Sequence, residues 1–186
     1  ILDPMSLGET RQAPKPELLE RLLAGELPVE SELPDAPDEL DSLMLRGLMP
    51  PLLTLGSTQA RLRWLDGYIA TYLERDLRQI SQIDALLDFR RLMELTALRS
   101  GQLLNQSDLA RDAQLSQPTA HRYLNLLETT HMFERLPAYT ASHTTRILKA
   151  PKLFWNDTGL AIFLSGYYTE SELQKARELG AFFETW

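Results

Sequence analysis

The chain has 186 residues, 44% of them hydrophobic, which suffices for one medium-sized domain or for a small domain with a flanking arm. It contains no cysteine, which excludes disulfides and thiolate metal sites, and no apolar run approaches the roughly 20 residues that span a bilayer. We therefore expect a cytoplasmic protein without a membrane partner.

The net charge of −7 belongs to the first third of the chain. Residues 1–60 hold 4 basic and 11 acidic residues, whereas residues 61–186 hold 15 of each. This neutral remainder lacks the basic surface of a typical DNA-binding module. The overall acidity therefore says little about what residues 61–186 bind.

Residues 1–57 are rich in proline and acidic side chains, above all from Leu27 to Asp38. Because proline breaks helices, we predict an irregular acidic arm with one helix around Pro16–Ala24 and an irregular connector over Leu43–Leu55. The start lacks an initiator methionine and a signal peptide, and we expect it to be a cut into a longer protein.

Two amphipathic helices are predicted next. Apolar residues at helical spacing predict a helix over 58–79, within a linking segment 58–83. A second helix is predicted over Asp84–Leu104, with Leu87 among its inward-facing residues.

The segment from Leu104 to Glu128 has the spacing of a helix-turn-helix. Ser107 is predicted to cap a short helix that runs through Ala113, and Ser116 to cap the second helix, Gln117–Thr130. Leu115 is predicted to be the buried residue of the turn. The predicted inner face of the second helix consists of Ala120, Tyr123, Leu124 and Leu127. Two strands, Met132–Tyr139 and a returning strand made of Arg146–Lys149 and Lys152–Trp155, are predicted to form a wing. Asn156 or Asp157 then caps a helix over Thr158–Leu164.

The expected fold is mainly α with a small β-wing. A winged helix-turn-helix over 84–166 follows the linking helix and the irregular acidic arm, and residues 167–186 begin a further, truncated domain.

Two roles of the winged helix stay open. DNA contact would use exposed side chains of the second helix and the wing: Gln117, Thr119, His121, Arg122, Asn125 and Arg146. A packing or protein-contact role is the alternative, because Arg122 is the only certain cation on that helix.

Motifs for catalysis are absent from this sequence. None of the nine glycines lies in a GxxxxGK[ST] phosphate loop, and neither GxGxxG nor GxSxG occurs. The separations of His121, His131 and His143 give no helical pair for a metal. We expect no catalytic residue, metal site or cofactor in this chain alone.

Four segments carry a family likeness when taken together. They are residues 1–9, residues 64–77 with the step Tyr72-x-x-Arg75-Asp76, residues 150–161 with Pro151-Lys152 and Asp157-x-Gly159-Leu160, and residues 180–186. Together they resemble prokaryotic AAA-type ATPases that carry a winged helix after the ATPase core and often end in a restriction-endonuclease-like domain. Gly47-Leu48-Met49-Pro50 stands where that family often has Gly-Gly-x-Pro.

The resemblance implies a non-catalytic regulatory and connecting portion of an ATP-binding protein. Its Walker segments, with ATP and Mg²⁺, would lie upstream of Ile1, and its nuclease-like carboxylates mostly downstream of Trp186. Arg75 would then sense a nucleotide phosphate, or else form a surface ion pair. The expected partners are its own ATPase and nuclease-like domains or another protein, with DNA and a second copy as further candidates.

Two rival functions remain. One is a DNA-binding winged-helix transcriptional regulator, which salt-dependent binding of duplex DNA would distinguish. The other is a fragment of a nuclease, which rests only on Glu184 in the last helix.

Overall fold

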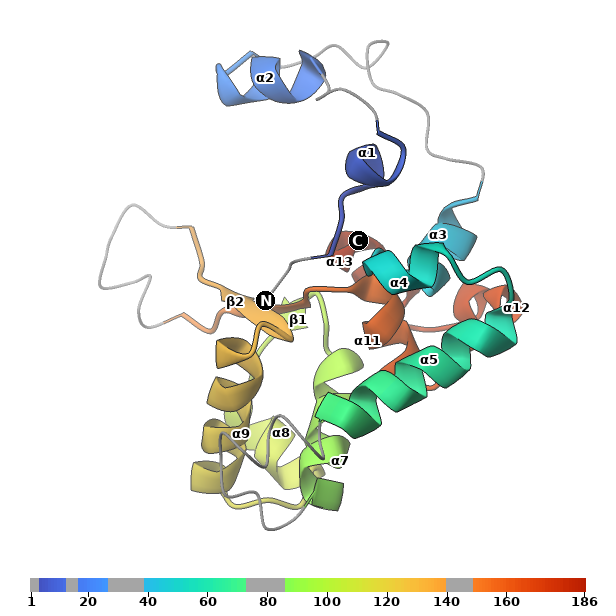
Figure 1. The fold of residues 1–186 in the computed structure, drawn as a ribbon. Helices are drawn as coiled ribbons and strands as arrows, with labels where there is room; N and C mark the ends of the chain where they lie inside the picture. The colour runs from blue at the N-terminus through green and yellow to red at the C-terminus, as the bar shows by residue number, and fades with distance from the viewer. Residues whose placement is uncertain (1–3, 13–16, 27–38, 73–85, 140–148) are drawn as a thin grey trace.

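The computed structural model describes residues 4–12, 17–26, 39–72, 86–139 and 149–186 (Figure 1). Within these ranges the chain is mainly helical and has one small antiparallel sheet of three strands. The expectation of a mainly α protein with a little β-structure is therefore confirmed at this coarse level. No helix in these ranges is long and apolar enough to cross a membrane.

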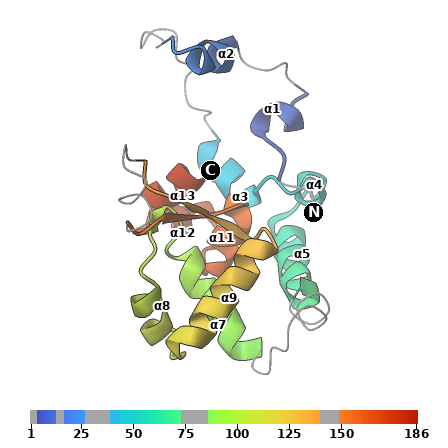
Figure 2. The ribbon, with the colours of Figure 1, turned by 90° about the vertical axis from the view of Figure 1, so that its left-hand side faces the viewer.

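The N-terminal region is more helical than its prolines suggest. Helix α2 (Glu17–Leu23) confirms the helix predicted around Pro16–Ala24, whereas α1 (Leu7–Thr10) was not predicted. Both short helices stand apart from the body in Figures 1 and 2. The prediction of an irregular connector over Leu43–Leu55 is wrong, because α3 (Leu40–Arg46) and α4 (Pro50–Leu53) form there. The two prolines occupy the first turn of α4, where a missing N–H costs no helical hydrogen bond.

Helix α5 (Thr58–Thr71) begins where the apolar periodicity predicts. The Ser57 side chain accepts a hydrogen bond from the Ala60 N–H, and Leu65 and Ile69 are buried. The predicted helix 58–79 is confirmed as far as α5 reaches, and its remainder from residue 73 lies outside the described residues.

Helix α7 (Leu86–Ala97) ends earlier than the predicted helix Asp84–Leu104, of which residues 84 and 85 lie outside the described residues. Gly101 has a φ of +76°, a left-handed conformation that suits glycine and lets the chain leave the helix. The following residues form strand β1 (Gln102–Leu103), which the sequence analysis missed. Leu87 was expected to face inward but is 79% exposed, whereas Phe89 on the same helix is buried.

Helices α8 (Gln106–Asp112) and α9 (Gln117–Thr129) form the predicted pair with a tight turn between them. Ser116 caps α9 by accepting from the Thr119 N–H, as predicted. The cap of α8 was predicted wrongly. Asn105, not Ser107, fills this position, because its Oδ1 accepts from the backbone N–H groups of the next turn.

Strands β2 (Phe133–Leu136) and β3 (Lys152–Trp155) complete the sheet in the order β1-β3-β2. Both neighbours of the central strand are antiparallel to it. The predicted pair of strands is therefore present in shortened form, and 146–148 of the expected returning strand lie outside the described residues.

Helix α11 (Thr158–Leu164) lies at the centre of the molecule and packs against α3, α5, α7 and α13. Asp157, one of the two predicted candidates with Asn156, caps it by accepting from the Leu160 N–H. Gly159 lies directly against Gly47, where an added Cβ would meet the Gly47 nitrogen at 2.6 Å. The chain closes with α12 (Glu170–Gln174) and α13 (Leu179–Thr185).

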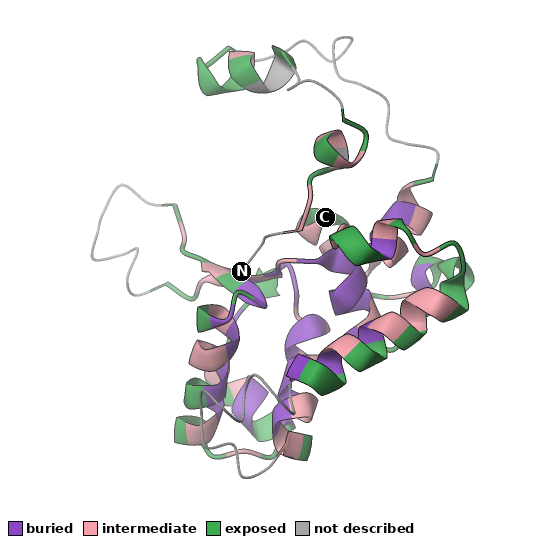
Figure 3. Ribbon diagram, viewed as in Figure 1, coloured by how far each residue is buried: buried purple, intermediate pink, exposed green. Residues whose placement is uncertain are grey.

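One hydrophobic core joins these elements, and the purple surfaces of α7, α9 and α11 in Figure 3 face it. Phe89 and Tyr123 meet edge to face at 4.9 Å between ring centroids, which fixes α9 against α7. Leu52 of α4 and Phe182 of α13 are fully buried in the same core. The orientation of α9 is thus set by packing along its whole inner face.

Candidate nucleic-acid interface

The candidate interface is the outer face of α9 with the start of α8. Gln117, His121 and Arg122 are exposed, and Thr119 and Asn125 are half-buried. The other two predicted site residues, Arg75 and Arg146, lie outside the described residues.

The inner face of α9 holds this outer face in place. The predicted inward residues are all buried: Ala120, Tyr123, Leu124 and Leu127. Ala110 of α8 is buried too, and its carbonyl accepts from the Leu115 N–H in the turn. Leu115 itself is only half-buried, although the sequence suggested a buried turn residue.

A chain of hydrogen bonds, which we call the polar relay, crosses the outer face. Gln106 Oε1 lies 3.1 Å from His121 Nδ1, and His121 Nε2 lies 3.0 Å from Asn125 Nδ2. Arg135 of β2 donates through Nη1 to Asn125 Oδ1 at 3.1 Å. Glu128 lies 3.2 Å from the same guanidinium nitrogen and completes the relay.

The donor-only guanidinium sets the direction of the relay. Because Arg135 can only donate, Asn125 must turn its oxygen toward it and its NH₂ group toward His121. His121 Nε2 is then an acceptor, so the neutral ring carries its proton on Nδ1 and donates to Gln106. The side chains expected to meet DNA are thus bonded to one another.

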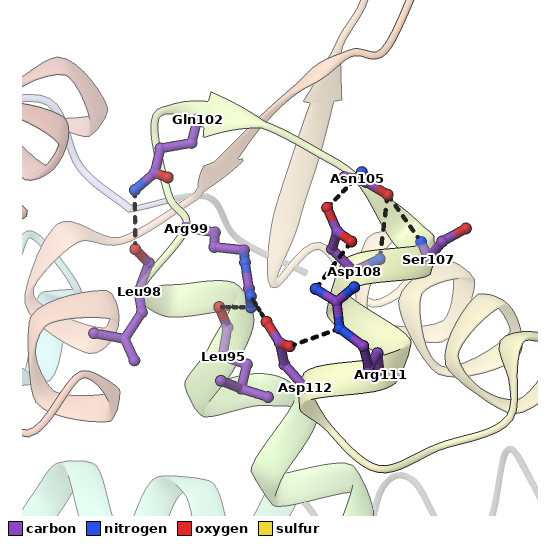
Figure 4. A network of polar contacts seen from close by, with 9 residues as sticks. All are labelled: Leu95, Leu98, Arg99, Gln102, Asn105, Ser107, Asp108, Arg111 and Asp112. Carbon is purple, nitrogen blue, oxygen red and sulfur yellow. Dashed lines mark hydrogen bonds and ion pairs between the residues drawn. The ribbon is translucent and has the colours of Figure 1, made fainter.

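Two arginines near this face, Arg99 and Arg111, are paired with carboxylates (Figure 4). Arg111 of α8 lies 3.0 Å from Asp108 and 3.5 Å from Asp112. Arg99 at the end of α7 also pairs with Asp112, and Asn105 Nδ2 donates to Asp108. These pairs remove positive charge that phosphate contacts would need.

Arg122 is the one Lys or Arg within α9. Its guanidinium carbon lies 5.2 Å from the centre of the Tyr123 ring, and no carboxylate among the described residues pairs with it. Gln117 is also exposed, where the starts of α8 and α9 border an open groove. Among the described residues of the interface, Arg122 is therefore the single uncompensated cation.

A separate apolar pocket of about 220 Å³ lies on another side of the body. Its walls include Trp64 and Tyr68, whose stacked rings are 5.3 Å apart, and Met132. Asp157 also lines it, and burial raises the pKa of this carboxyl group, although backbone N–H groups of Leu48 and Leu160 donate to it. Because one oxygen accepts from Leu48 and the other from Leu160, the carboxylate joins the segment after α3 to the start of α11 and has a structural role, which we call the Asp157 clip.

The described residues contain no group of three His, Asp or Glu side chains that could hold a metal ion. Glu184, the basis of the nuclease alternative, pairs with Lys152 and so ties α13 to the sheet.

Gln106, at one end of the relay, and Arg135, which orients it, were not predicted from the sequence. The spacing of His121 and Asn125 by four residues could have indicated that they meet on one helix face. Nothing in the linear pattern brings Arg135 to them, because that contact depends on how β2 turns back beside α9.

Comparison with known proteins places the chain in a family. Residues 37–171, well over half of the chain, match the family described as Domain of unknown function (DUF8612), and the chain belongs to it. Together with the fold, this defines a largely helical domain whose sheet is built around β3.

Two mycobacterial relatives extend this finding. The Uncharacterized protein Rv2008c of Mycobacterium tuberculosis and the Uncharacterized protein Mb2031c of Mycobacterium bovis are each 37% identical over 144 residues. The match covers 77% of this chain but only 33% of each relative, so the chain spans about a third of their length. No solved structure matches the chain.

Proposed function

We propose that the unit from α7 to β3 is a winged helix-turn-helix and that the chain is the non-catalytic, regulatory and connecting portion of an AAA-type ATP-binding protein. The order helix, strand, helix, helix, strand, strand supports the first part, as does the sheet order with the last strand in the middle. The tight turn before Ser116 is that of a helix-turn-helix.

A connecting role is favoured over DNA readout by one observation: the polar side chains on the outer face of α9 are hydrogen-bonded to one another. A helix that reads bases needs free donors and acceptors together with cations for the phosphates. Here His121 and Asn125 are bonded within the polar relay, and Arg111 is paired with carboxylates. Such a face rigidifies the domain and suits contact with protein.

Two observations support the link to an ATPase. The four segments that resemble AAA-type ATPases include Tyr72-x-x-Arg75-Asp76. The relatives are also three times longer than the matched region, which leaves room for a nucleotide-binding domain in them.

The nucleotide role is tested by ATP hydrolysis in the intact protein. If Arg75 contacts a phosphate, Arg75→Ala should lower turnover about tenfold or more, because a guanidinium stabilises phosphoryl charge. Arg63→Ala is the matched control, since Arg63 is an exposed arginine on α5. Unchanged turnover of a folded Arg75 variant would reject this role, and an intact protein that neither binds nor hydrolyses ATP would reject the ATPase link.

A DNA-binding transcriptional regulator is the second candidate, and the uncompensated Arg122, together with the exposed Gln117, favours it. It predicts that the isolated chain binds duplex DNA at low salt and that Arg122→Ala weakens binding and lowers the salt slope by about one. Arg63→Ala again serves as control. Absence of binding at low salt would remove this candidate and leave the connecting role.

A further inference from the structure

Eight large apolar side chains are exposed in the described parts of the chain, and five of them fall into two groups. One group lies on the sheet, where Leu103 is 65% exposed, Leu136 is 58% exposed and Tyr139 is fully exposed. The other lies on α2, where Leu22 and Leu23 are 43% and 80% exposed. Clustered apolar exposure of this kind marks contact surfaces, whereas single exposed residues are ordinary.

The strand register gathers the first group into one surface. Leu103 of β1 and Leu136 of β2 both pair with Lys152 of the central strand, so the three side chains form one row across the same face. Ala138, Tyr139 and Ala150 border the same shallow depression. We call this surface, with Leu103, Leu136 and Tyr139, the sheet patch.

Helix α2 carries exposed leucines and acidic side chains that could contact the sheet patch. It stands away from the body in both ribbon views and does not lie on the sheet patch of its own subunit (Figures 1 and 2). Its first turn carries Glu17 and Glu20, whereas Lys149 is exposed next to the sheet patch. Lys152, within the row, is already paired with Glu184.

We propose that the sheet patch binds α2 of a second copy of this chain. Leu22 and Leu23 of α2 cover the apolar row, and the acidic first turn of the helix faces Lys149. Reciprocal exchange gives each subunit one donated and one accepted helix, so a two-fold dimer closes with both patches covered. This dimer is independent of the ATPase and DNA proposals.

Sedimentation of the 186-residue chain tests the dimer with charge-reversing variants. The helix variant carries Leu22→Lys and Leu23→Lys, and the patch variant carries Leu103→Glu and Leu136→Glu. The wild type should dimerise, and each variant alone should dimerise about tenfold or more weakly, because two buried leucines are lost at each contact. A mixture of both variants should recover the dimer, since lysines on one helix then meet glutamates on the other patch.

Leu87→Lys is the matched control, because Leu87 is as exposed as Leu23 but belongs to neither group. Circular dichroism establishes that each variant is folded. A wild type that stays monomeric overturns the proposal, as do a dimer unaffected by both variants and a mixture that fails to reassociate. A monomer whose α2 covers its own sheet patch would overturn the second copy as occupant.

Discussion

At the scale of single residues, Arg135 on the short strand β2 orients polar side chains of the neighbouring helix α9. Its side chain is only 16% exposed, and it holds Asn125 and Glu128 of α9 at once. Because it has no acceptor, it determines which end of the Asn125 amide faces His121. The chemical identity of one strand residue thus sets the proton position on a helix residue.

Replacing Arg135 by Leu should therefore release His121 from a single tautomer. We expect nitrogen NMR of the wild type to show the Nδ1-protonated ring, and that of Arg135→Leu to show a mixture of tautomers. Arg111→Leu is the control, because Arg111 is also ion-paired but lies outside the relay. A ring whose tautomer is unchanged in the Arg135 variant would contradict the proposed direction of the relay.

Gly159 lies at a position where only a residue without a side chain fits. An added Cβ would lie 2.6 Å from the Gly47 nitrogen, and a backbone atom cannot move aside as a flexible side chain can. Gly159→Ala should destabilise the protein by about 3 kcal/mol or more in urea unfolding. Gly180→Ala has open space around its site and should change stability by less than about 1 kcal/mol. Equal stabilities would show that α11 can move away from α3.

At the scale of elements, the caps decide where helices begin. Ser107 looked like the start of α8 because serine is a good cap and an apolar pair follows it. Asn105 is the N-cap instead, because its Oδ1 accepts from the N–H groups of Ser107 and Asp108. Its Nδ2 also donates to the Asp108 carboxylate. The helix begins one residue earlier than the predicted cap.

This correction can be measured. Asn105→Ala should cost about 1 kcal/mol of unfolding free energy, whereas Ser107→Ala should cost only a few tenths, because Ser107 is an exposed position within the helix. The reverse order in denaturant unfolding would restore Ser107 as the cap.

At the scale of the whole molecule, the last helix is part of the core. Phe182 is fully buried and packs edge to face against Tyr167, while its neighbour Phe183 is 53% exposed. Ser100 and Thr185 are hydrogen-bonded, which joins the end of α7 to the end of α13.

Phe182→Ala should therefore destabilise the chain by about 3–5 kcal/mol, because it leaves a cavity in the core. Phe183→Ala should cost less than about 1 kcal/mol. Thermal unfolding of both variants would show the difference. A small effect of Phe182→Ala would mean that α13 folds apart from the rest of the core.

Local patterns sufficed for much of this protein. The periodicity of α5 and α9, the cap at Ser116 and the inner face of α9 follow from neighbours within one or two turns, so they could be predicted from the sequence alone. For α11 the local pattern left Asn156 and Asp157 open as caps, and the structure selects Asp157. Strand β1 was missed because two residues carry no periodic pattern, and Leu87 was misplaced because an apolar residue at helical spacing does not reveal which side another element covers.

Contacts between residues far apart in the chain depend on the tertiary fold and could not be predicted from local sequence. The polar relay needs β2 beside α9, the Asp157 clip needs Leu48 beside α11, and the sheet patch needs β1 and β2 on either side of β3. These contacts arise when the burial of one shared core brings distant segments together. Chain spacing alone therefore cannot specify them, whereas a helix and its cap are specified by hydrogen bonds between near neighbours.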